Sequence, residues 1–96
     1  MNTSNIQASQ NDRILLVGDI VKHFKFETLS NHDKFNKRYL YKIIGFGKHT
    51  ETNEHMVIYE SLYDYQIWIR PLELFMSTVD NEKYPNINQK YIFEKI

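Results

Sequence analysis

The chain of 96 residues contains no cysteine. Without thiols it can form no disulfide framework, zinc finger, iron–sulfur cluster or cysteine nucleophile. This absence is typical of proteins in a reducing compartment, and we expect a cytoplasmic location. No window approaches the roughly 18 to 20 apolar residues that a membrane span requires, so we expect no membrane partner.

Glycine and proline are scarce, with three and two residues, whereas 42% of the residues are hydrophobic and 15% are aromatic. Disordered and collagen-like chains have the opposite composition, so this chain should fold. Its length suits one domain. Residues 1–12 are polar and lack the features of a signal peptide or a mitochondrial presequence. We predict a disordered polar tail over residues 1–12 and a single β-rich domain over residues 13–96.

Net charge is also absent, because 12 Lys and Arg balance 12 Asp and Glu. This excludes strong non-specific attachment to nucleic acid or to anionic membranes. The charge is nevertheless uneven, since residues 13–50 carry eight Lys or Arg against three Asp or Glu, and residues 51–96 carry four against eight. A nucleic-acid interface would use the cations of the first half, provided that they share one face. They include Lys22, Lys25, Arg38, Lys42 and Lys48.

Short, β-branched and partly alternating segments predict strands. They cover residues 15–25, 39–49, 55–63, 66–70 and 91–93, with a polar hairpin turn at 51–54. Residues 27–38 are polar, and Ser30 three positions before Asp33 is a weak capping pattern for one short helix within a loop.

One short amphipathic helix is predicted from Pro71 to Val79. Proline suits a first helical position, and Leu72, Phe75, Met76 and Val79 follow with helical spacing. The predicted fold is mainly β: a small SH3-like barrel or a strongly curved antiparallel sheet with one short helix. The number of strands does not separate these two forms.

Four blocks of sequence resemble an uncharacterised bacterial family, the domain of unknown function numbered 1653. They are Gly-Asp-Ile-Val-Lys-His-Phe-Lys (18–25), Tyr-Lys-Ile-Ile-Gly-Phe-Gly-Lys-His-Thr-Glu-Thr (41–52), Val-Ile-Tyr-Glu-Ser-Leu-Tyr (57–63) and Trp-Ile-Arg-Pro-Leu-Glu-Leu-Phe (68–75). The resemblance spans about residues 17–80 and implies a small, mostly β domain with no assigned activity. The polar segment 27–38 is longer than the glycine-bearing turn of many members.

Trp68 and Arg70 are the first candidate site residues. Strand alternation places them on the same side, where the Arg70 guanidinium could hold a carboxylate or phosphate through two hydrogen bonds. The alternative is structural: Trp68 packs in the core, and Arg70 pairs with Glu73, Glu60 or a backbone carbonyl.

His23 and His49 each end a predicted strand after an apolar run. A neutral imidazole there could act as a general base or metal ligand, and Glu51 could orient His49. The alternative is that both histidines cap turns. The spacing of His23, His32, His49 and His55 matches no metal-ligand pattern, so we expect no metal site and no cofactor.

Aromatic residues form a third candidate group, in which Tyr59, Tyr63 and Tyr65 precede Trp68. Such rings can line a groove for a peptide, a methylated side chain or a stacked base, and they can equally fill a small core. Both interpretations stay open.

We predict a small non-enzymatic binding module whose groove is lined by His23, His49, Tyr59, Trp68 and Arg70. Its ligand would be a small molecule, a peptide or a nucleic acid. No phosphate loop, nucleophile elbow or other catalytic motif occurs, so no residue is assigned a catalytic role. The alternatives are a nucleic-acid-binding domain that uses the basic first half, a small hydrolase that uses His49 and Glu51, and a domain whose sheet edge pairs with another chain.

Overall fold

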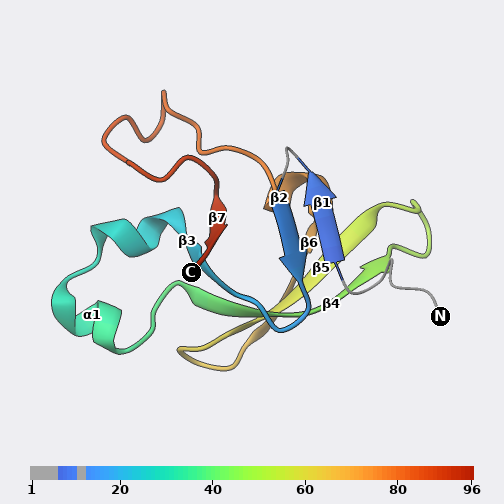
Figure 1. Ribbon diagram of the computed structural model, residues 1–96, viewed down its shortest axis with the longest axis horizontal. Coiled ribbons are helices and arrows are strands. Elements are labelled where there is room, and N and C mark those ends of the chain that lie inside the picture. Colours follow the sequence, from blue (N-terminus) through green and yellow to red (C-terminus); the bar gives the residue numbers. More distant parts are fainter. Residues whose placement is uncertain (1–6, 11–12) are drawn as a thin grey trace.

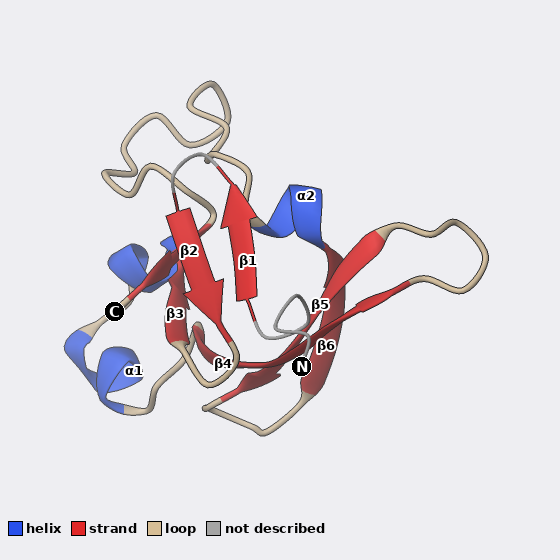
Figure 2. Ribbon diagram, turned by 45° about the vertical axis from the view of Figure 1, so that its right-hand side comes forward, coloured by secondary structure: helices blue, strands red, loops and turns tan. Residues whose placement is uncertain are grey.

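The computed structural model describes residues 7–10 and 13–96, and its main element is a five-stranded antiparallel sheet (Figure 1). The strand order is β6 (Ile67–Pro71), β5 (His55–Ser61), β4 (Leu40–Lys48), β3 (Ile20–His23) and β7 (Phe93–Lys95). A second sheet pairs β1 (Gln7–Gln10) with β2 (Arg13–Leu16), and both views show it across one face of the larger sheet (Figure 2).

The mainly β prediction is confirmed, and the strongly curved sheet is the form that the chain adopts. The sheet does not close into a barrel, because β6 and β7 end the strand order and do not pair with each other. Curvature is concentrated in β4, whose register with β5 shifts between Ile43 and Gly45. A bulge of this kind bends a strand and increases its twist.

The prediction of a single helix over Pro71–Val79 needs correction. Helix α2 covers only Leu72–Phe75, and Pro71 ends β6 and caps the helix. The helix stops early because the backbone beyond it pairs with the C-terminal segment: Thr78 bridges to Tyr91, and the Val79 N–H donates to the Lys90 carbonyl at 2.8 Å. The apolar stripe is still buried, since Phe75, Met76 and Val79 all lie in the interior.

Two further short helices occupy the polar segment before β4. The 3₁₀-helix η1 covers Phe24–Thr28, and α1 covers Asn31–Phe35. The Ser30 side chain accepts a hydrogen bond from the Asp33 N–H at 3.2 Å, as the capping pattern predicts. The described chain therefore has two short α-helices rather than one.

The core lies between the inner face of the larger sheet, β2 and α2. Its fully buried members include Val21, Ile43, Val57, Phe75 and Phe93, and Leu15 of β2 packs with them. The predicted tail falls largely outside the described residues, which exclude 1–6 and 11–12, while Gln7–Gln10 pair with β2. No helix in the described part of the chain is long and apolar enough to cross a membrane.

Candidate functional site

The register of the larger sheet brings four of the five predicted site residues to one face. Trp68 lies directly opposite Tyr59, Arg70 opposite Val57, and His23 opposite Phe93. Directly opposed residues of antiparallel strands point to the same side of the sheet. The buried Tyr59, Val57 and Phe93 belong to the core, so this is the inner face.

These four side chains line a pocket of about 190 Å³. Its complete lining is His23, Lys25, Tyr39, Tyr41, Tyr59, Trp68, Arg70 and Phe93. A second hollow of about 240 Å³ shares Tyr39, Tyr41 and Trp68 with it and is completed by Arg38, Ser61, Tyr63 and Asp64. Because the two hollows have three residues in common, we treat them together as the aromatic groove.

The aromatic walls of the groove are fixed by ring packing. The rings of Tyr41, Tyr59 and Phe93 meet edge to face, with centroids 5.3 to 5.7 Å apart, and Phe93 stacks on Phe75 at 4.2 Å. Such pairs stabilise their geometry beyond the burial of area. Trp68 contacts no other ring among the described residues and is 50% exposed, so its indole face remains open.

Arg70 enters the groove without an acidic partner. Its guanidinium carbon lies 5.5 Å from the centroid of the Phe93 ring, a cation–π contact. Over residues 13–96, no carboxylate lies within ion-pair distance of Arg70 and no carbonyl accepts a hydrogen bond from it. No buried nitrogen without a partner occurs in this range, so the free N–H groups of Arg70 are open to solvent.

His23 is held as a neutral imidazole at the edge of the groove. Its Nδ1 accepts a hydrogen bond from the Lys25 N–H at 3.1 Å and caps η1. An acceptor at Nδ1 places the ring proton on Nε2. Burial, together with smaller contributions from the positive charges of Arg70 and Lys25, lowers the pKa of His23 to about 4.

Tyr41 keeps its hydroxyl proton across the physiological range. Burial raises its pKa to about 12, with smaller contributions in the same direction from Tyr59, Tyr39 and Asp64, while Arg70 opposes them. The polar groups at the Arg70 end are therefore mostly donors: a guanidinium, an ammonium, an imidazole N–H and phenol hydroxyls. An oxyanion is the ligand that such a set of donors binds best.

His49 does not belong to the groove. It follows β4 at the hairpin turn, where its Nδ1 accepts hydrogen bonds from the N–H groups of Glu51 at 3.1 Å and Thr52 at 3.4 Å. This is the turn-capping alternative. Among residues 13–96 the Glu51 carboxylate makes no hydrogen bond to His49, so the contact that the hydrolase hypothesis requires is not formed.

The basic residues of the first half do not share one face. Lys25 and Arg38 line the aromatic groove. Lys22 and Lys42 neighbour His23 and Tyr41 along their strands, and alternation therefore directs them to the outer face. Lys48 lies at the far end of β4, opposite His55.

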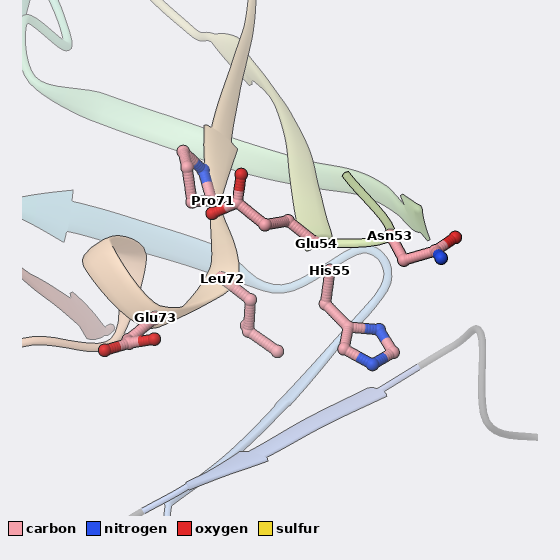
Figure 3. A pocket seen from close by; sticks show the side chains of 6 residues that line it. All are labelled: Asn53, Glu54, His55, Pro71, Leu72 and Glu73. Atoms are coloured by element: carbon pink, nitrogen blue, oxygen red, sulfur yellow. The ribbon is translucent and has the colours of Figure 1, made fainter. Parts of the chain in front are cut away.

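A larger hollow of about 430 Å³ lies beside the β4–β5 hairpin turn. It is lined by Asn53, Glu54, His55, Pro71, Leu72 and Glu73. Figure 3 shows that the side chains of Asn53, His55 and Glu73 point in different directions and do not converge on a common point. We therefore take the aromatic groove, where polar groups and rings meet, as the candidate site.

Half of the pocket lining was not predicted from the sequence as part of a groove, namely Lys25, Tyr39, Tyr41 and Phe93. Tyr41 could have been predicted from the hairpin. Ile43 lies opposite Tyr59, and Tyr41, two positions before Ile43 on the same strand, therefore points to the same face. Tyr39 has a positive φ of 62°, which the sequence does not indicate, and Phe93 arrives through the long-range pairing of β7 with β3.

Metal ligands do not cluster in the described ranges, where no three His, Asp or Glu side chains are placed to hold an ion. A family model matches residues 19–90, and its description is "Protein of unknown function (DUF1653)". No curated protein matches the chain significantly, and no solved structure does.

Proposed function

The chain belongs to the DUF1653 family of proteins of unknown function, whose description names no ligand, and from the site itself we propose a small non-enzymatic binding module. Its aromatic groove binds a ligand that carries an oxyanion on a flat or apolar group. The observation that carries this proposal is the Arg70 guanidinium, which lines an aromatic pocket and has no acidic partner among residues 13–96.

The oxyanion would lie at the Arg70 end of the groove. A carboxylate or phosphate there receives two parallel N–H donors from the guanidinium and the charge of Lys25. The neutral His23 adds an N–H without adding a third positive charge, because its pKa is lowered to about 4. These donors are open before binding, so the ligand breaks no ion pair of the described chain.

The flat part of the ligand would lie against Trp68. Trp68 is half exposed and contacts no other ring of the described residues, and stacking on such a face contributes about 1–3 kcal/mol for a planar base. The pocket at the Arg70 end has a volume of about 190 Å³, below the roughly 300 Å³ typical of drug-sized ligands. It suits one ring or one side chain rather than a large cofactor.

The groove gives less support to the other hypotheses. The nucleic-acid hypothesis would need the five basic residues on one face, and the strand register divides them. The hydrolase hypothesis would need the Glu51 carboxylate on His49, and the turn presents the Glu51 N–H instead. The cytoplasmic location of the protein stays a prediction from the sequence.

A matched pair of probes tests the proposal: benzoate carries the oxyanion on a ring, and benzamide has the same shape without the charge. Both are titrated into isotope-labelled protein while backbone amide and indole N–H signals are followed by NMR. We expect benzoate to shift the Trp68 indole and the amides of Arg70 and His23 locally, at least tenfold more tightly than benzamide. Equal binding of the two, or no local shifts up to tens of millimolar, would contradict the proposal.

A further inference from the structure

Strand β6, which carries Trp68 and Arg70 into the groove, is an edge strand. It ends the strand order of the larger sheet, and no described strand pairs with its outer side. An unpaired edge offers a row of backbone donors and acceptors to another chain. The groove and this edge are therefore parts of one surface.

The ladder between β5 and β6 fixes which backbone groups are free. The Ser61 N–H donates to the Gln66 carbonyl at 2.9 Å, which makes this a hydrogen-bonded pair. Such pairs alternate along an antiparallel ladder, so Trp68 and Arg70 direct their backbone groups to β5. Ile67 and Ile69 direct their N–H and C=O groups to the outer edge, where the Ile67 carbonyl accepts a hydrogen bond from the Gln66 side-chain amide at 3.1 Å and the other three groups have no partner among residues 13–96.

Apart from the Gln66 amide on the Ile67 carbonyl, β6 lacks the features that keep another strand from pairing with an edge. Natural edge strands are usually protected by charged side chains, proline or bulges. Here Ile67 and Ile69 are 44% and 63% exposed, and the proline stands only at the end of the strand, where its missing N–H would face outward. The edge is open over Ile67–Ile69.

We infer that the ligand of the groove is an extended acidic peptide that pairs with β6 as a sixth strand. This inference rests on the proposed function and names its ligand class. The peptide would form backbone hydrogen bonds with Ile67 and Ile69. Its residues opposite Trp68 and Arg70 would form close, non-hydrogen-bonded pairs, so their side chains would point into the groove.

Charge complementarity identifies the side chains. The residue opposite Arg70 is acidic, because Arg70 and Lys25 line the pocket without an acidic partner among residues 13–96. The residue two positions away lies over the Trp68 indole and is apolar or aromatic. A second copy of this chain fits less well, because its own edge segment, residues 66–71, contains no carboxylate.

The probe is the acetylated and amidated peptide Thr-Glu-Val-Phe-Val-Glu-Thr, which reads the same in both directions and so allows either strand orientation. One control peptide replaces both Glu by Gln. The other carries N-methyl groups on the backbone nitrogens of both Val, which removes donors for strand pairing and keeps the charge. Binding to labelled protein is followed by NMR shifts and by amide hydrogen exchange.

We expect the acidic peptide to shift the amides of Ile67 and Ile69 and to slow their exchange at least tenfold. The Gln peptide, the N-methylated peptide and the Arg70→Met variant should each weaken binding at least tenfold. Ile69→Pro removes one outward N–H at an edge position that tolerates proline, and it should do the same. If Ile69→Pro does not fold, the N-methylated peptide still tests whether backbone hydrogen bonds to β6 are needed for binding.

Other outcomes overturn the inference in distinguishable ways. If benzoate binds near Arg70 and the peptide leaves the Ile67 and Ile69 amides unchanged, the proposed function stands and strand pairing is wrong. If neither probe binds, both are wrong. Three results would contradict an acidic peptide as the ligand. The acidic and Gln peptides could bind equally well, or β6 could pair between two copies of the chain without peptide. A short oligonucleotide could also bind more tightly than the peptide and displace it.

Discussion

Trp68 and Tyr59 lie directly opposite each other on neighbouring strands, yet Trp68 is 50% exposed and Tyr59 only 4%. The difference arises because Tyr59 is on an interior strand under the core, whereas Trp68 is on the edge strand. One ring builds the wall of the groove, and the other leaves a face open to a ligand.

Replacing Arg70 with Met should remove ligand binding and leave the fold nearly intact. Its guanidinium makes a cation–π contact with Phe93, worth about 0.5–1 kcal/mol at a partly exposed site, and no hydrogen bond or ion pair among residues 13–96. Thermal unfolding should shift Tm by no more than a few degrees. A loss of stability well above this range would show that Arg70 is structural.

Arg13→Met is the matched control, because Arg13 is a structural arginine. It donates hydrogen bonds to the carbonyls of Met76, at 3.3 Å, and Phe93, and its guanidinium lies 3.8 Å from the Tyr91 ring centroid. Losing these contacts leaves partly buried carbonyls without a donor, so we expect destabilisation by about 2–3 kcal/mol in chemical denaturation. A change below about 0.5 kcal/mol would contradict this role.

Trp68 is the one tryptophan of the chain, so tryptophan fluorescence reports on the groove alone. The half-exposed indole should emit at a wavelength typical of partly hydrated tryptophan, and saturation with benzoate should change the intensity. Arg70→Met should abolish the change at the same benzoate concentration. A fluorescence change of the same size in the variant would show that the benzoate detected by Trp68 is not bound by Arg70.

His23 provides a test by pH. Its folded-state pKa of about 4 lies below the ordinary value of 6.5, so the unfolded chain binds a proton first on acidification. The stability due to neutral His23 is therefore complete above about pH 6.5 and is lost as the pH falls toward 4. His23→Gln should flatten the pH dependence of unfolding in this interval, and an unchanged slope would argue against the lowered pKa.

An anion in the groove should reverse part of that shift. Benzenesulfonate stays negatively charged throughout this pH range, and its charge beside Arg70 and Lys25 favours protonated His23. NMR titration of the imidazole should give a higher pKa with saturating benzenesulfonate than without it. An unchanged pKa would place the anion away from His23.

Strand alternation predicted that Trp68 and Arg70 share one face, which is the central part of the candidate site. The sequence pattern placed Trp68 and Arg70 on one side of a short strand, and the register with β5 puts both on the inner face. The capping pattern at Ser30 and the burial of Phe75 and Met76 could be predicted for the same reason: each depends on residues a few positions apart. Local periodicity is sufficient for such features.

Features that depend on distant pairing could not be predicted. The helix after Pro71 ends early because Thr78 and Val79 bond to a segment more than ten residues farther along the chain. Phe93 reaches the groove only because β7 pairs with β3. His23 and His49 look similar in sequence, and in both the Nδ1 accepts the backbone N–H two positions farther along. Only the long-range pairing of β3 with β7 places His23, and not His49, in the groove.

The charge selectivity of the groove tests the account most directly. Dissociation constants of benzoate and benzamide are measured by NMR for the wild type and for Arg70→Met, with Lys48→Met as a control that removes a positive charge outside the groove. We predict at least tenfold selectivity for benzoate in the wild type and in the Lys48 variant, and none in the Arg70 variant. Selectivity that survives in Arg70→Met, or is absent from the folded wild type, would contradict an oxyanion site built on Arg70.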